Sequence, residues 1–269
     1  MRHSIYFHHI GKTGGTSLGT ILADAIGQDQ SYPHHGISRA LLEGTHRFRL
    51  FTGHYPYDVV QLLPRPLRVV TTVREPVAHV VSMVNHLRRL GLDHIALRHR
   101  TRPLESLDDF LEDPVLARIS TNMQTFSVGR SISAARLREA AERIDGVNWT
   151  ATGTGEDFWC LYGSPEDDRH DPALLARGLE RLSDDHVVAV GCEQIDAAIN
   201  AVLGQLGIVS VATASTRLNV APRDEKTLRV ERISPQQRRE IENRTRLDHA
   251  LHRAVTAAAA SLTDATAAA

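Results

Sequence analysis

A short segment that combines glycines, hydroxyl side chains and a lysine is the part of the sequence best suited to chemistry. Gly14 and Gly15 let the backbone bend sharply and approach an anion closely. Lys12 adds a positive charge, and the neighbouring hydroxyls add hydrogen-bond donors. The segment therefore predicts a loop that holds a phosphate-like group, with contacts expected from Gly11, Lys12, Thr13, Gly14, Gly15, Thr16 and Ser17.

The elements that must position this loop follow from the apolar pattern. The loop separates a buried strand from a helix, whose N-terminus adds a partial positive charge. Strands then alternate with helices, which predicts a parallel sheet that binds ligands beyond the carboxyl ends of its strands. A last helix is expected from Ser234 through Val255, with a capping box at its start. The other predicted strands are 4–10, 67–73 and 187–190, and the helices are 18–26, 76–90 and 193–206.

The loop differs from an ATP-binding P-loop. That motif needs a glycine where this chain has Tyr6, and here the paired glycines follow the lysine. A kinase or NTPase would also need an acidic residue after a second strand to hold magnesium. The second strand instead ends in Val73-Arg74, and a basic residue binds an anion rather than a metal. Both features speak against ATP hydrolysis.

Residues 9–18 resemble the 5′-phosphosulfate loop of the P-loop-like sulfotransferases, most closely the heparan/dermatan 2-O-sulfotransferase type and its bacterial relatives. That family commonly has proline in place of Gly11. Arg74, followed by Ser82, resembles the pair with which the family holds a 3′-phosphate. The family often has another arginine soon after, so His79 or a residue elsewhere must replace it. The resemblance implies an α/β fold, a P-loop-like three-layer sandwich with helices on both faces of a parallel sheet.

Phe51-Thr52-Gly53-His54-Tyr55 resembles the family's Gly-His segment, whose histidine serves as general base. A histidine pKa of about 6.5 suits that role. The resemblance implies an O-sulfotransferase that uses 3′-phosphoadenosine 5′-phosphosulfate (PAPS), releases 3′-phosphoadenosine 5′-phosphate (PAP) and needs no metal. Lys12 and His54 are the predicted catalytic residues, and Arg74 and Ser82 complete the PAPS site. The other candidate bases are His8, His9, His34, His35, His79 and Glu75.

Composition limits the partners and the compartment. The 269 residues carry a formal net charge of −1, which gives no general attraction for nucleic acid or an anionic membrane. Two cysteines form no disulfide framework, and the sequence shows neither a signal peptide nor a membrane helix, so we expect a cytoplasmic protein. We expect a single domain over 1–256, with an insert at about 130–172 and an Ala-rich tail over 257–269.

The acceptor and two other functions are left open by the sequence. The acceptor is expected to be a hydroxyl-bearing small molecule or glycan. Two interpretations of a group of five arginines stay open, attraction of an anionic acceptor and a solvated surface; the five are Arg88, Arg89, Arg98, Arg100 and Arg102. The alternatives to a sulfotransferase are a small-molecule kinase with a degenerate P-loop and a non-catalytic nucleotide-binding protein. The sequence does not indicate the oligomeric state.

Overall fold

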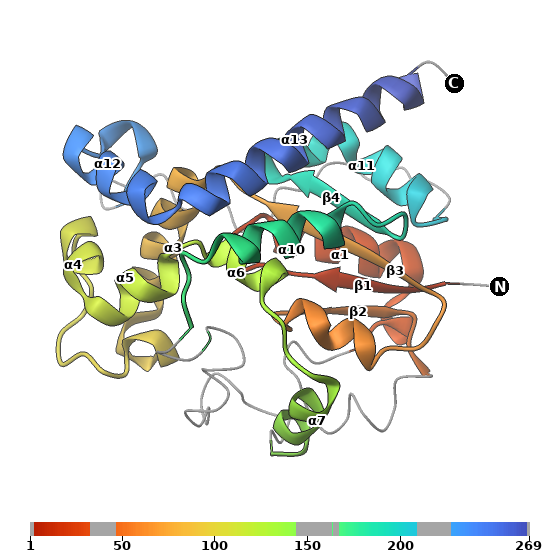
Figure 1. Cartoon of the computed structure of the whole chain (residues 1–269), viewed down its shortest axis with the longest axis horizontal. Coiled ribbons are helices and arrows are strands. Elements are labelled where there is room, and N and C mark those ends of the chain that lie inside the picture. The colour runs from red at the N-terminus through yellow and green to blue at the C-terminus, as the bar shows by residue number, and fades with distance from the viewer. Residues whose placement is uncertain (1–2, 33–46, 144–162, 164–166, 209–226, 268–269) are drawn as a thin grey trace.

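The centre of the molecule is a parallel sheet of four strands (Figure 1). This computed structural model describes residues 3–32, 47–143, 163, 167–208 and 227–267. The strands are β1 (Ser4–His8), β2 (Leu50–Gly53), β3 (Leu67–Val73) and β4 (Val187–Gly191), and their order is β2-β1-β3-β4. All three pairings are parallel. The predicted parallel sheet is confirmed, and β1 and β3, which precede the two predicted anion-binding motifs, are neighbours.

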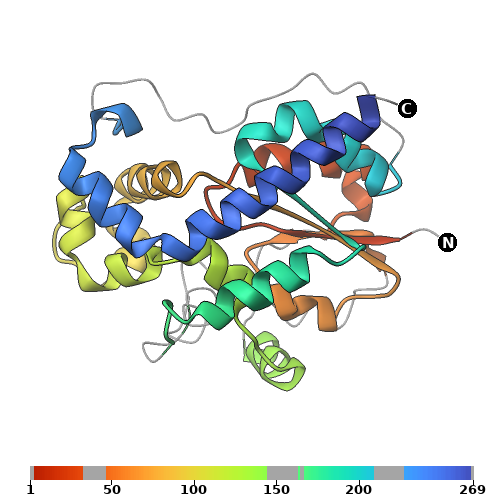
Figure 2. The same cartoon turned by 45° about the horizontal axis from the view of Figure 1, so that its top comes forward.

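Each face of the sheet carries its own apolar core, because successive side chains of a strand point to opposite faces. On one face Ile5 and Phe7 of β1 pack with α1 (Gly15–Ile26) and α11 (Ile195–Gln205). On the other face Tyr6 belongs to a cluster with residues of α6 (Met123–Gly129), α7 (Ala134–Arg143) and α10 (Pro172–Leu182). Figure 2 shows helices on both sides of the strands. The predicted three-layer α/β arrangement is therefore confirmed.

The long helix α13 (Arg246–Ala267) lies along β4 and contributes to both cores. Leu251 and Val255 join the cluster of Tyr6, whereas Ala259 joins that of Phe7. The prediction of one continuous helix from Ser234 is wrong, because α12 (Pro235–Arg244) ends at Thr245, whose hydroxyl donates to the Ile241 carbonyl at 2.8 Å. The predicted capping box at Ser234 is confirmed.

A third group of helices packs beyond the carboxyl ends of the strands (Figure 1). It contains α3 (Pro76–Leu90), α4 (Leu107–Glu112), α5 (Pro114–Ser120) and α12, which share an apolar cluster around Phe110. Side chains cap their N-termini, with Ser106 on α4 and Asp113 on α5. Short 3₁₀ helices complete the described chain at Gln28–Gln30, Tyr57–Gln61, Gly91–Asp93, Ile95–Leu97, Cys192–Gln194 and Val230–Arg232.

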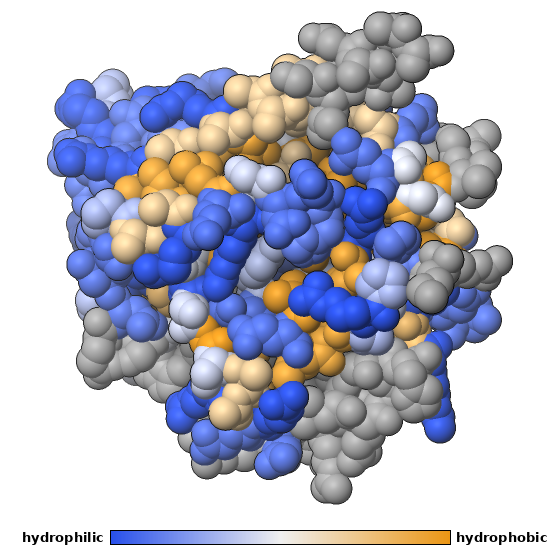
Figure 3. Space-filling view, turned by 45° about the vertical axis from the view of Figure 1, so that its right-hand side comes forward, coloured by the Kyte–Doolittle hydropathy of each residue, from blue (hydrophilic) through white to orange (hydrophobic). Residues whose placement is uncertain are grey.

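Polar residues are spread over the face shown in Figure 3, among smaller apolar areas. Within the described ranges, the large apolar side chains that are exposed are Leu90 and Leu92. Among the helices of the described residues, none has the length and hydropathy needed to cross a bilayer. His34, His35 and most of the predicted insert (144–162 and 164–166) lie outside the described residues.

Candidate functional site: the loop after β1 and its neighbours

The loop after β1 folds back onto the sheet through Thr13. The Thr13 hydroxyl donates to the Ile10 carbonyl at 2.7 Å and, having used its proton, accepts from the Thr72 hydroxyl at 2.8 Å. Thr13 is fully buried. The Thr13 side chain therefore holds the loop against β3. The group of Thr13 that can donate to an anion is its backbone N–H.

The paired glycines are required by packing as well as by backbone conformation. Gly14 has a φ of +83°, and a Cβ there would lie 2.8 Å from the Cys192 sulfur. A Cβ on Gly15, the first residue of α1, would overlap the His9 imidazole. Both contacts bring the start of α1 close to the ends of β1 and β4. Close packing therefore also requires glycine at positions 14 and 15. The sequence did not reveal this requirement, which adds to the predicted close approach of an anion.

Lys12 lies among other cations. It is half-buried and has a φ of +69°. The pKa of Lys12 is lowered to about 8, mainly by burial and then by the nearby charges of Arg89 and Arg74. A bound anion would offset this repulsion, so the electrostatics favour a negatively charged ligand at Lys12.

Arg74 connects the end of β3 to the loop. Its guanidinium Nη1 donates to the Lys12 carbonyl at 3.2 Å. The two predicted anion-binding groups are therefore adjacent in space, although 62 residues separate them in the sequence. Ser82 lies half-buried on α3, and its position three residues after His79 and four before His86 places it on their side of the helix.

His79 does not supply the missing positive charge. It is buried, and its Nε2 lies 2.8 Å from the Gly11 carbonyl, to which it must donate. Burial lowers the pKa of His79 to about 4, partly offset by this hydrogen bond, so the ring is neutral at pH 7. His79 thus fixes the loop at Gly11, where the sulfotransferase pattern has proline.

His54 follows β2 and reaches the same loop from the other side. Its Nδ1 lies 2.9 Å from the His9 carbonyl and must donate there. A neutral His54 then carries its lone pair on Nε2. The ring centroids of His54 and His9 are 4.4 Å apart, and a Cβ on Gly11 would lie 3.8 Å from His54 Cε1. The structure therefore brings His54 together with the loop, in a tautomer that can accept a proton.

Two of the other candidate bases have structural roles. His8 is fully buried, hydrogen-bonds Thr71 and Ser127, and has its pKa lowered to about 3 by burial and then by nearby arginines. Glu75 caps α3, where its carboxylate accepts from the Val77 and Ala78 N–H groups at 3.1 and 2.7 Å. These contacts account for both residues without a role in proton transfer.

Sequence reasoning missed His86, which lies one turn after Ser82 on α3. The pKa of His86 is lowered to about 3, mainly by burial and then by the charges of Lys12, His94, Arg89 and His54. His86 therefore lies near both predicted catalytic residues. The spacing of 79, 82 and 86 along one helix side was the signal that could have found it.

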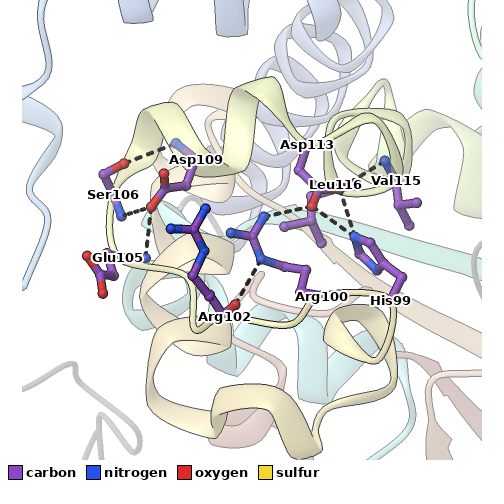
Figure 4. A network of polar contacts seen from close by, with 9 residues as sticks. All are labelled: His99, Arg100, Arg102, Glu105, Ser106, Asp109, Asp113, Val115 and Leu116. Carbon is purple, nitrogen blue, oxygen red and sulfur yellow. Dashed lines mark hydrogen bonds and ion pairs between the residues drawn. The ribbon is translucent and has the colours of Figure 1, made fainter.

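Arg100, one of the five arginines considered for an anionic acceptor, is already paired (Figure 4). Its Nη1 lies 2.7 Å from Asp113 Oδ2, and His99 Nε2 lies 2.8 Å from the same oxygen. Asp113 also caps α5. For Arg100 the structural interpretation is therefore the better one, whereas Arg89 is exposed and lies near Lys12.

The comparisons with known proteins found similarity only to distant solved structures. No protein-family model matches the chain, and no curated protein matches it in sequence. Among solved structures, mouse sulfotransferase SULT7A1 complexed with PAP has a TM-score of 0.47 and 15% identity over 91% of this chain and 85% of that one. A sulfotransferase from Alicyclobacillus acidocaldarius has a TM-score of 0.44 and 13% identity over 95% of this chain and 96% of that one.

Proposed function

We propose that the chain is a nucleotide-dependent group-transfer enzyme built on a parallel α/β sheet. More specifically, it is a sulfotransferase that moves a sulfuryl group from PAPS to a hydroxyl of a small molecule or glycan. It acts as a single domain over 1–256 in the cytoplasm. The observation that carries the proposal is the contact of the Arg74 guanidinium with the Lys12 carbonyl, because it brings two anion-binding groups to neighbouring strand ends.

The residues present fit a nucleotide with phosphates at both ends of its ribose. The N–H groups of residues 13–17 would hold the 5′-phosphate at the start of α1. Arg74 and Ser82 would hold the 3′-phosphate, which ATP lacks. In the described residues no group of three or more His, Cys, Asp or Glu is placed to bind a metal. The cations that surround Lys12 supply positive charge directly at the site.

The transfer would proceed by in-line displacement at sulfur. His54 Nε2 takes the proton of the acceptor hydroxyl as its oxygen forms a bond to sulfur. The bond between sulfur and the bridging phosphate oxygen breaks, and its electron pair leaves on PAP. Lys12 would stabilise the negative charge that develops on that oxygen. Positioning and electrostatics then account for most of the rate enhancement.

Titration calorimetry with PAP and with ATP, each with and without magnesium, tests the proposal. We expect PAP to bind more tightly than ATP, without a need for magnesium, and turnover of labelled PAPS in the presence of an acceptor mixture. A preference for ATP with magnesium would favour the kinase alternative. Tight PAP binding without turnover in any acceptor mixture would favour the non-catalytic one.

Ser82→Ala is expected to weaken PAP binding about tenfold, because a hydrogen bond to a charged group would be lost. Adenosine 5′-phosphate (AMP), which lacks the 3′-phosphate, should bind within about twofold of its wild-type affinity. Alanine is a good helix former, so α3 should remain intact. Calorimetry with both ligands measures the two effects, and an equal loss for PAP and AMP would contradict the role of Ser82 at the 3′-phosphate.

A further inference from the structure

The corner between β3 and α3 is held by side chains from other elements. The Arg74 N–H donates to Gln124 Oε1 at 2.7 Å, and Gln124 Nε2 donates to the Arg74 carbonyl at 2.9 Å. The next N–H, that of Glu75, donates to Glu193 Oε1 at 3.0 Å. One amide therefore satisfies both backbone groups of Arg74 at the point where the strand ends.

Gln124 is itself firmly fixed. It is fully buried near the start of α6, where the Gln124 and Thr125 N–H groups donate to Asp248 of α13 at 3.3 and 2.7 Å. In return, Asn122 Oδ1 accepts from the Leu247 N–H at 2.9 Å. The starts of α6 and α13 thus cap each other, and Gln124 has little freedom to follow a displaced Arg74.

A second contact from α13 supports the other half of the corner. His252 lies one turn after Asp248, and its Nε2 is 3.3 Å from Glu193 Oε2. Asp248 and His252, on one side of α13, are therefore linked to the consecutive residues Arg74 and Glu75, each through one intermediate residue. α13 acts as a rigid support for the corner from which the guanidinium leaves the sheet.

We propose that Gln124 is a positioning residue for Arg74, and that it sets the discrimination between nucleotides with and without a 3′-phosphate. The inference rests on the proposed function. Gln124 holds the Arg74 backbone, so the guanidinium is aimed at the loop before any ligand arrives, and little ordering is needed on binding. Without Gln124 the strand end could rotate, and the guanidinium would lose its fixed direction relative to Lys12.

Gln124→Met tests this role, because methionine has a similar volume and can make neither hydrogen bond. We expect PAP affinity to fall about tenfold while AMP affinity stays within about twofold, so that the ratio of the two affinities collapses. Gln124→Glu keeps the acceptor for the Arg74 N–H but lacks the amide donor, and it should show a smaller loss of the same ratio. Calorimetry gives the affinities, and thermal unfolding gives the stability of each variant.

Asn85→Ala is the matched control. Asn85 forms the same two-bond clamp on a backbone, but on Leu228, with Nδ2 2.9 Å from the Leu228 carbonyl and Oδ1 2.9 Å from its N–H. The loss of this clamp should lower stability while leaving the ratio of PAP to AMP affinity unchanged. It therefore separates a general loss of stability from a specific effect on Arg74.

The outcomes separate the inference from the proposed function. If the wild-type protein binds PAP no better than AMP, the proposed function fails. If the wild-type protein binds PAP more tightly than AMP and Gln124→Met keeps the same ratio of the two affinities, the positioning role is wrong. If Gln124→Met does not fold, Gln124→Glu is measured instead. A ratio of PAP to AMP affinity equal to that of the wild type in Gln124→Glu would overturn the inference.

Discussion

Replacing Lys12 by alanine is expected to lower kcat at least 100-fold, which corresponds to about 2.7 kcal/mol of lost transition-state stabilisation. Lys12 lies in the loop, half-buried beside Arg74 and Arg89, where the surroundings strengthen its interaction with an anion. In the proposed reaction, the charge that grows on the leaving phosphate oxygen would lose the Lys12 cation. Steady-state turnover of labelled PAPS at saturating donor and acceptor measures the effect.

Lys12→Met separates the charge from the shape of the side chain. Methionine keeps a similar stem and the same left-handed backbone cost, so it should be as inactive as the alanine variant. The pKa of Lys12, about 8 in the free protein, adds a second readout. A bound anion raises this pKa, so wild-type PAP affinity should be full below pH 8 and fall as the pH rises above it. Lys12→Met should lack this fall, and a Lys12→Met variant with wild-type kcat would remove Lys12 from the mechanism.

The sequence predicted the elements whose apolar pattern is local. β1 and β3 are rich in apolar and β-branched residues, each is followed by a loop or a basic residue, and most of their residues are buried. β2 was not predicted, because four residues at the sheet edge carry too little periodicity. The break at Thr245 was also missed, since the apolar spacing from Ile241 to Leu251 continues across it.

The candidate site was predictable only where its residues lie within short motifs. The loop and His54 come from such segments, and the structure brings them together around the His9 carbonyl. The clamp on Arg74 joins residues 50 positions apart, and the contact of Asp248 with Thr125 spans 123. Pairs at such separations leave no periodic signal, because they are created by the sheet order and by the course of α13.

His54→Ala is expected to lower kcat at least 100-fold while PAP affinity stays within about twofold of the wild-type value. The physical reason is the tautomer: Nδ1 donates to the His9 carbonyl at 2.9 Å, so Nε2 carries the lone pair that accepts the acceptor proton. Turnover at saturating PAPS measures kcat, and PAP calorimetry measures binding. Normal turnover of His54→Ala at saturating PAPS would show that another group is the base.

His54→Asn distinguishes proton transfer from support of the loop. The asparagine amide can still donate toward the His9 carbonyl, which preserves a contact like that of Nδ1, but it cannot accept a proton at neutral pH. If His54 is the base, the asparagine variant should be as slow as the alanine variant. If it recovers most of the wild-type kcat, the hydrogen bond to His9 is the function of His54. The base would then be sought first at His9, whose ring centroid lies 4.4 Å from that of His54.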